Sequence, residues 1–151
     1  MSDENKKYEL VKTDTVTTSG RTLYRIRALV AIGLLVAPGE LGGYVENENN
    51  LSLSGNAWVS GDAQVYGNAQ VYGDARVKAR YDIQWFSNVG SESGTLTVCK
   101  AKRGLFVSRG CFSGTLPQFK KAVKAKHADS KIGRHYATLI QSVEIWFGEE
   151  K

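Results

Sequence analysis

The sequence predicts a mainly β fold with helices at the C-terminal end, and three observations support this prediction. A six-residue pattern of Val, Gly, Asn or Asp, and Ala recurs between Gly55 and Val77. Segments with the alternating polarity of strands lie on both sides of it, and two stretches with helical spacing follow. The expected order is an N-terminal β-hairpin cap, a short hexapeptide β-solenoid, a three-stranded antiparallel sheet and two helices, the last two forming an α+β part. We expect these units to span residues 1–40, 41–83 and 84–151.

The first strands are predicted to form a hairpin. Residues 7–11 and 21–29 flank the turn residues Thr17–Gly20. In the second of these strands, Leu23 lies on one face and Tyr24 and Ile26 lie on the other, which is the pattern of a half-buried strand. This hairpin is expected to cap the repeats.

A period of six matches an extended strand that is broken by a regular corner. Glycine followed by Asn or Asp tolerates the left-handed backbone angles of such a corner, and each glycine comes two residues before an alanine. The residues predicted to point inward are Leu53, Val59, Val65, Val71, Val77 and Ile83, with the small residues Ala57, Ala63, Ala69 and Ala75 beside them. This spacing favours a β-solenoid in which each turn of chain packs on the one before it. A meander of short hairpins with Gly-Asn and Gly-Asp turns is the alternative.

The C-terminal part is predicted to hold three strands, at residues 83–89, 94–101 and 105–112. Thr115 and Gln118 then have the spacing of a capping box, so a helix is expected from there to about Lys126. A second helix is expected over residues 131–147. Its apolar stripe comprises Ile132, Tyr136, Leu139, Ile140, Val143, Trp146 and Phe147.

Several motifs resemble a family of small, mostly uncharacterised phage and prophage proteins. The motifs are TLYRIRAL at 22–29, LGGYVE at 41–46, NLS at 50–52, the VYGNA and VYGDA repeats, WFSNVG at 85–90 and GCFSGTL at 110–116. The repeats are also similar to those of left-handed parallel β-helices, in which three hexads make one triangular coil. The resemblance implies a phage-associated accessory role in the cytoplasm of the bacterial host, and it carries no catalytic residues to this chain.

Composition and motifs favour a binding protein over an enzyme. Hydrophobic residues make up 42% of the chain and charged residues 23%, as in ordinary globular proteins. The longest apolar run, residues 28–37, is shorter than the roughly 20 residues that cross a bilayer, and the N-terminus has no signal-peptide pattern. We therefore expect a cytoplasmic protein that does not act at a membrane. Cys99 and Cys111 match no zinc pattern, and we predict no disulfide, metal or cofactor.

The positions of the histidines disfavour the acyltransferase activity of many hexapeptide proteins. The repeats contain no histidine, and the two in the chain, His127 and His135, fall in the predicted helices. His127 and Asp129 could be imagined as an acid–base group with His135. The alternative is structural, with Asp129 or Ser130 capping the second helix and His127 near the end of the first.

Basic residues concentrate in the last third of the chain. Residues 100–151 carry eleven Lys or Arg against four Asp or Glu, within a formal net charge of +5. The residues predicted to bind an acidic partner are Lys102, Arg103, Arg109, Lys120, Lys121, Lys124 and Lys126. The leading hypothesis is a non-enzymatic phage accessory protein that occupies a host factor, as an anti-defence or takeover inhibitor. The alternatives are nucleic-acid or nucleotide binding through the basic face, a structural oligomerisation module, or a merely solvated lysine-rich helix.

A short solenoid also predicts self-association. About two coils leave open ends and a flat flank, and closed symmetry is the usual use of such a surface. We expect a homo-oligomer, dimer or trimer, with Trp58, Tyr66 and Tyr72 at the contact.

Overall fold

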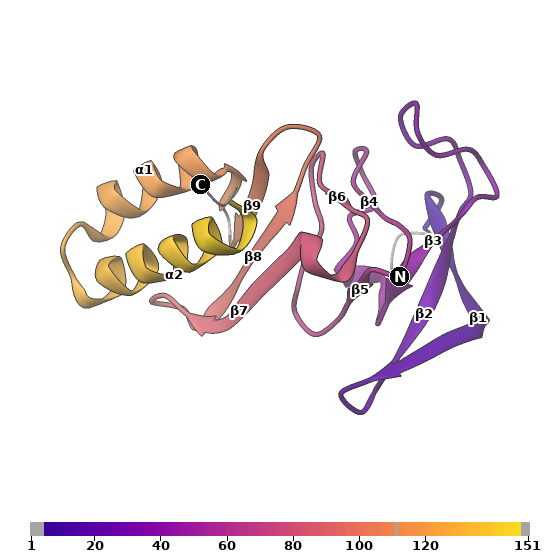
Figure 1. Cartoon of the computed structure of the whole chain (residues 1–151), viewed down its shortest axis with the longest axis horizontal. Coiled ribbons are helices and arrows are strands. Elements are labelled where there is room, and N and C mark those ends of the chain that lie inside the picture. Colours follow the sequence, from indigo (N-terminus) through magenta and orange to yellow (C-terminus); the bar gives the residue numbers. More distant parts are fainter. Residues whose placement is uncertain (1–4, 111, 149–151) are drawn as a thin grey trace.

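The computed structural model describes residues 5–110 and 112–148. Within them the chain is mainly β, with two C-terminal helices, as the sequence predicts. The hairpin lies at one end of the molecule and the helices at the other (Figure 1). The strands are β1 (Tyr8–Thr18), β2 (Arg21–Ala28), β3 (Leu41–Val45), β4 (Trp58–Val59), β5 (Gln64–Val65), β6 (Arg76–Val77), β7 (Ile83–Val89), β8 (Gly94–Lys100), β9 (Leu105–Arg109) and β10 (Phe112–Thr115); the helices are α1 (Leu116–His127) and α2 (Lys131–Phe147).

The predicted N-terminal hairpin is confirmed. Strands β1 and β2 pair antiparallel from Tyr8 opposite Ala28 to Thr18 opposite Arg21. Ser19 and Gly20 form the turn with positive φ angles of 51° and 75°, which suit the twist of a two-residue hairpin loop. Strand β3 adds antiparallel to β2, and β5 then adds parallel to β3, so the hairpin continues into the repeats.

The repeats are joined by short parallel pairings. Strand β4 pairs with β6 through Val59 opposite Val77, and Leu51 forms an isolated parallel bridge to Val71. Valines of successive hexads and all four predicted alanines are buried in one core. Gly55, Gly61, Gly67 and Gly73 all have φ between 63° and 74°, which explains why glycine recurs at each corner.

One inward prediction in this region is wrong. Leu53 is 43% exposed, and Leu51 occupies the core position in its place. Eight residues separate Leu51 from Val59, where six separate the later valines. The two extra residues lie in the loop that carries Leu53 outward, so the hexad period is interrupted between Leu51 and Val59, while Val45 and Leu51 are again six residues apart and buried.

The C-terminal sheet has four strands, in the order β10-β9-β8-β7, and not the three that were predicted. The segment 105–112 was predicted as one strand, but the chain reverses at Gly110, whose φ is 57°. Phe112 therefore pairs back against Arg109 as the first residue of β10. Cys99 lies opposite Phe106 in the β8–β9 register.

The two faces of this sheet contact different parts of the molecule. Leu96, Val98 and Val107 pack under the helices in a second core with Phe119 and Ile140. The alternate residues face the repeats, since side chains alternate across a strand. Cys99 belongs to the repeat core, and Phe106 and Trp85 pack against it. Burial on both faces explains why the middle of β8 is continuously buried.

Both helices begin where the sequence predicts. The Thr115 and Gln118 side chains form the reciprocal capping box of α1, and Ser130 accepts a hydrogen bond from the Gly133 amide at the start of α2. Trp146 is an exception to the predicted buried stripe, because it is 51% exposed and its Nε1 donates to the Tyr81 carbonyl. In the described part of the chain, neither helix is both long and apolar enough to cross a bilayer.

Burial raises the pKa of the Cys99 thiol, because the charged thiolate is disfavoured in an apolar core. Cys99 is a free cysteine, and the predicted absence of a disulfide involves Cys111, which lies outside the described residues.

Candidate functional site

The seven basic residues predicted as one binding face lie in three different places. Lys102 and Arg103 lie in the turn between β8 and β9, and Arg109 lies at the opposite end of that hairpin. The four lysines, Lys120, Lys121, Lys124 and Lys126, are exposed on α1. Lys120 pairs with Glu144 of α2 at 2.6 Å, so its charge is partly neutralised by the neighbouring helix.

Arg109 differs from the others because its side chain is only 10% exposed. Its Nε donates to the Tyr136 hydroxyl at 2.9 Å, and Nη2 donates to the Val89 carbonyl at 3.4 Å. The nearest carboxylate is that of Glu92, at 3.7 Å from Nη1, and the Glu92 side chain is 77% exposed. Glu92 therefore compensates the buried charge only weakly, because its carboxylate is solvated.

Two glycines make the space that Arg109 occupies. A Cβ at Gly90 would overlap the Tyr136 hydroxyl and would lie 2.7 Å from Arg109 Nη2, and a Cβ at Gly94 would lie 3.0 Å from the guanidinium carbon. Gly90 also has a φ of 79°, a conformation that favours glycine. The β7–β8 turn is therefore shaped around the guanidinium, although the sequence shows only an ordinary Gly-Ser loop.

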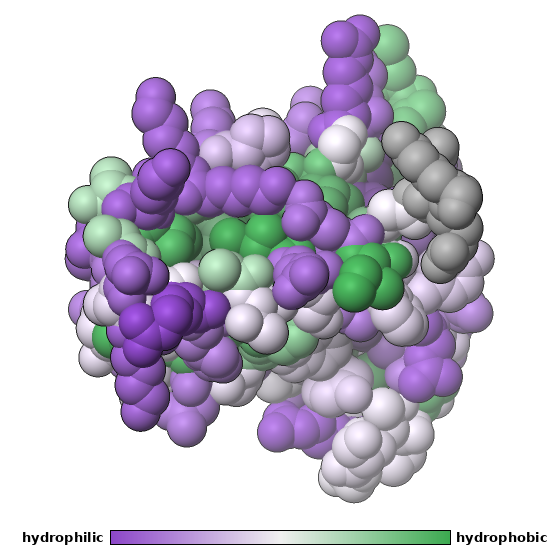
Figure 2. Space-filling view, turned by 60° about the vertical axis from the view of Figure 1, so that its left-hand side comes forward, coloured by the Kyte–Doolittle hydropathy of each residue, from purple (hydrophilic) through white to green (hydrophobic). Residues whose placement is uncertain are grey.

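A cavity of about 440 Å³ opens beside this guanidinium, between α1 and the sheet. Aromatic side chains form part of its wall, with ring centroids 5.3 Å apart for Phe112 and Phe119 and 5.4 Å apart for Phe119 and Tyr136. The residues around it are Ser91, Glu92, Arg109, Phe112, Phe119, Ala122, Val123, Lys126, His127 and Tyr136. In Figure 2, hydrophilic side chains project from the surface, with patches of hydrophobic surface between them.

The cationic side of this cavity comes from two elements. Arg109 ends β9, and Lys126 and His127 lie in the last turn of α1, where positive side chains interact favourably with the helix dipole. The His127 ring lies 5.8 Å from that of Tyr136. His127 is therefore at the helix end that the sequence predicts, and His135 is an exposed residue of α2.

A second cavity, of about 420 Å³, also has Arg109 in its wall. Its other residues are mostly polar or glycine and come from four segments of the chain: Asn47, Asn49, Gly67, Asn68, Ala69, Gln70, Ser93, Gly94, Thr95 and Gly110. One guanidinium thus borders an aromatic cavity and a polar one. A guanidinium has five N–H donors, of which two are used within the described residues. The remaining donors can bind a carboxylate or phosphate oxygen.

We name this arrangement the Arg109 pocket, defined by Arg109, Lys126, His127, Tyr136 and Glu92. The sequence predicts a binding role for Arg109 and Lys126 and a core position for Tyr136, whereas Glu92 was not predicted. No local spacing connects residues 92, 109, 126 and 136, because they lie on a turn, a strand and two helices. The only local signal is an arginine that ends a strongly apolar strand.

Of the three residues predicted at the oligomer contact, the prediction for Trp58 is wrong. It is 4% exposed and packs in the repeat core, edge-on to Tyr8 with ring centroids 6.4 Å apart. Tyr66 and Tyr72 are half-buried. Tyr66 stacks edge-on against Trp85 at 4.9 Å, and the Arg21 guanidinium lies 5.9 Å from its ring.

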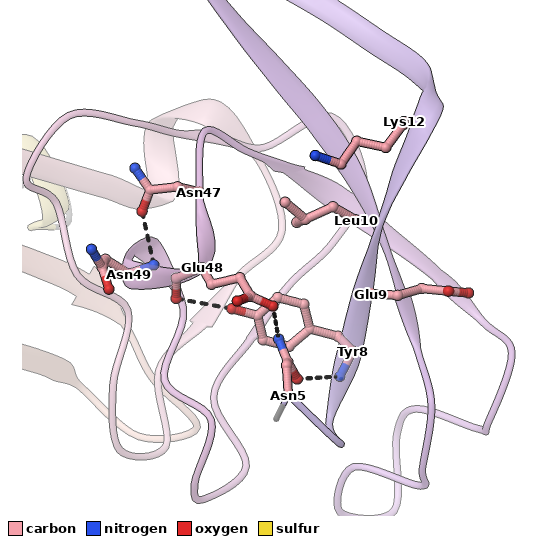
Figure 3. Close-up of a pocket in the computed structure, with 8 residues that line it drawn as sticks. All are labelled: Asn5, Tyr8, Glu9, Leu10, Lys12, Asn47, Glu48 and Asn49. Carbon is pink, nitrogen blue, oxygen red and sulfur yellow. Dashed lines mark hydrogen bonds between the residues drawn. The ribbon is translucent and has the colours of Figure 1, made fainter. Parts of the chain in front are cut away.

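A larger and more open depression, of about 800 Å³, lies between β1 and the loop after β3 (Figure 3). Its polar groups already bind one another. The Tyr8 hydroxyl lies 3.0 Å from the Glu48 carbonyl oxygen, and Asn5 Nδ2 donates to the Glu48 carboxylate at 2.8 Å. Since these bonds fasten β1 to the repeats, we assign the depression to folding rather than to ligand binding.

A scan against models of protein families and a search of curated proteins found no match to this chain.

Proposed function

We propose that this protein is a non-enzymatic binding protein that captures an acidic group of its partner in the Arg109 pocket. The observation that carries the proposal is the buried Arg109 guanidinium, which has unused N–H donors and only a solvated carboxylate near it. Burial strengthens an ionic hydrogen bond because the surrounding dielectric constant is low. Lys126 and His127 add donors at the rim.

The resemblance to small phage and prophage proteins favours a host factor as the partner, in the cytoplasm of the infected bacterium. In this role the protein acts by occupancy, as an anti-defence or takeover inhibitor, and uses no cofactor. The exposed Lys121 and Lys124 on α1 extend the positive surface beyond the pocket and can steer an acidic partner towards it.

A pull-down from bacterial lysate tests this proposal, with mass spectrometry of the bound proteins and small molecules. We expect one stoichiometric partner for the wild-type chain and strong depletion of that partner for Arg109→Gln and Lys126→Gln. Lys126 is exposed, so its variant keeps the fold even if Arg109→Gln loosens the contact with Tyr136. Lys12→Gln, on β1, is the matched control. Equal recovery with both pocket variants would contradict the proposal.

A nucleotide or nucleic acid is the second candidate partner, and the aromatic wall favours it. Phe112, Phe119 and Tyr136 lie beside two cations, and aromatic rings with adjacent cations suit a base and its phosphate. A gel shift at low ionic strength and a titration with ATP test this candidate. Binding must weaken steeply with salt, and absence of both signals would exclude it.

For the repeats we propose a short β-solenoid that self-associates. The parallel pairings join residues 20 positions apart in Tyr44–Gln64 and 18 apart in Trp58–Arg76. Three hexads per coil give the latter spacing, which supports the proposal. We expect a dimer or trimer by light scattering, loosened by Tyr66→Glu or Tyr72→Glu and unaffected by Lys124→Glu. A monomer of 16.6 kDa would contradict the self-association.

A further inference from the structure

A separate cavity, of about 550 Å³, lies between the loop after β2 and the turn that joins β8 to β9. One wall is apolar and the other is cationic. The residues around it are Gly33, Leu34, Leu35, Asn56, Arg76, Lys78, Asp82, Lys100, Ala101 and Lys102. We call it the Arg76 cavity, and none of its residues belongs to the Arg109 pocket.

The apolar wall is a loop that holds two leucines away from the core. Ile32 and Val36 pair across the base of the loop, and both are buried. Leu34 at the tip is fully exposed, and Leu35 is largely exposed. The Ile32–Val36 pairing closes the base of the loop, and both leucines lie in solvent beyond it. Exposed apolar side chains gathered beside a cavity are typical of an interaction site.

The cationic wall carries four positive side chains and one carboxylate. Asp82 is committed to the backbone, since its Oδ2 accepts hydrogen bonds from the amides of Lys78 and Ala79. Lys100 lies 3.6 Å from Asp82 Oδ1, so its charge is partly compensated. In the described residues, Lys78 and Lys102 make no ion pair, and Arg76 Nε is buried without a hydrogen-bond partner.

The position of Arg76 limits what can bind. Arg76 follows the buried Ala75 and precedes the buried Val77, so its backbone belongs to the repeat core. Its side chain lies beside Gly33 and Asn56, with Nη2 3.7 Å from where a Cβ of Gly33 would be. Arg76 lines the cavity together with Leu34 and Leu35, so a group that pairs with its guanidinium also lies near the two leucines.

We propose that the Arg76 cavity binds an acidic segment of a partner protein in which carboxylates flank an aliphatic side chain. The carboxylates pair with Arg76, Lys78 and Lys102, and the aliphatic side chain packs against Leu34 and Leu35. A lipid headgroup layer fits less well because it is flat, and a nucleic-acid backbone fits less well because it has no apolar side chain to pack against the leucines. An acidic peptide satisfies both walls at once.

Selection from a displayed random peptide library tests this proposal with the full chain. We expect enriched peptides that place Asp or Glu next to Leu, Ile, Val or Met. Their affinity should fall about tenfold or more for two double variants, Leu34→Ser with Leu35→Ser and Lys78→Glu with Lys102→Glu. The matched control is Lys12→Glu with Lys131→Glu, two exposed lysines that line neither this cavity nor the Arg109 pocket, and it should change affinity less than about twofold. Circular dichroism verifies that each variant is folded.

Three results would overturn the proposal: no enrichment of any peptide, enrichment of peptides without acidic residues, or equal affinity for the wild type and both cavity variants. Vesicles containing phosphatidylserine and a single-stranded oligonucleotide are tested in parallel. If the vesicles or the oligonucleotide bind the wild type and both cavity variants lose this binding, the cavity is assigned to lipid or nucleic acid. This result would also overturn the proposal. Arg109→Gln should leave peptide affinity unchanged, so this site and the Arg109 pocket can fail independently.

Discussion

The Asn50 side chain connects two segments of the repeat region, and its removal should strongly destabilise the protein. Asn50 is fully buried. Its Oδ1 accepts hydrogen bonds from the amides of Asn47 at 3.0 Å and Glu46 at 3.2 Å, and its Nδ2 donates to the carbonyls of Ala69 at 2.8 Å and Gly67 at 3.2 Å. These four bonds use the whole capacity of the amide group.

The size of the effect follows from which partners are left unpaired. In Asn50→Ala, the Glu46 amide keeps its bond to the Val65 carbonyl, whereas the Asn47 amide and the Ala69 carbonyl lose the bonds that Asn50 makes. Each buried group left without a partner costs about 1–3 kcal/mol. For two such groups we therefore expect the free energy of unfolding to fall by about 2–6 kcal/mol, a large share of the about 5–15 kcal/mol typical of a domain.

Urea unfolding followed by circular dichroism measures this loss. Asn49→Ala is the matched control, because Asn49 is exposed and its side chain makes no hydrogen bond among the described residues. Its effect should stay within about 0.5 kcal/mol. Asn50→Asp keeps the shape but places an oxygen opposite two carbonyls, so it should destabilise at least as much as alanine. If both Asn50 variants unfold within about 1 kcal/mol of the wild type at an unchanged m-value, the reasoning is wrong.

Three further predictions concern Lys7, Gly73 and Cys99. Burial lowers the pKa of Lys7 to about 8, below the value of about 10.4 in an unfolded chain. Between about pH 8 and 10 the Lys7 amine therefore binds more protons in the unfolded state than in the folded state. The contribution of Lys7 to stability rises with pH over this window. Unfolding of wild type and Lys7→Met at several pH values should show the wild type gaining relative stability over this window, and a constant difference would refute the assignment. Gly73→Ala should destabilise more than Gly67→Ala by thermal unfolding, because both have a φ of 63° but only a Cβ at Gly73 would overlap the Phe106 ring; equal losses would mean that the ring moves aside freely. Cys99 should resist alkylation in the folded protein and react on unfolding, and the intact mass should not change on reduction; rapid labelling of the native chain at this residue would contradict its burial.

Local patterns in the sequence were sufficient for the elements whose cause is local. The first hairpin turn, the Thr115 capping box and the N-cap of α2 depend on the backbone preferences and hydrogen bonds of adjacent residues. The capping box was predicted at its observed position. The turn was predicted over residues 17–20 and comprises Ser19 and Gly20, and of the two predicted N-cap candidates, Asp129 and Ser130, the structure has Ser130. The glycine at each repeat corner was predicted for the same reason. The predicted strand at 105–112 was wrong because nothing in the local pattern distinguishes the turn at Gly110 from a glycine within a strand.

What the sequence determined by itself is therefore the mainly β class with two C-terminal helices, the N-terminal hairpin, and the buried valines and alanines of the repeats. Only the tertiary structure decided which charges act together. The C-terminal sheet packs between the repeats and the helices, and this packing brings side chains from distant elements into the same cavity. Ten basic residues between positions 100 and 135 appeared as one cluster. Lys102 and Arg109 lie at opposite ends of the β8–β9 hairpin. Lys102 lines a cavity with Leu34, and Arg109 donates a hydrogen bond to Tyr136. The sequence shows how many charged residues a segment contains. The distances between their side chains depend on the register and packing of the strands that carry them.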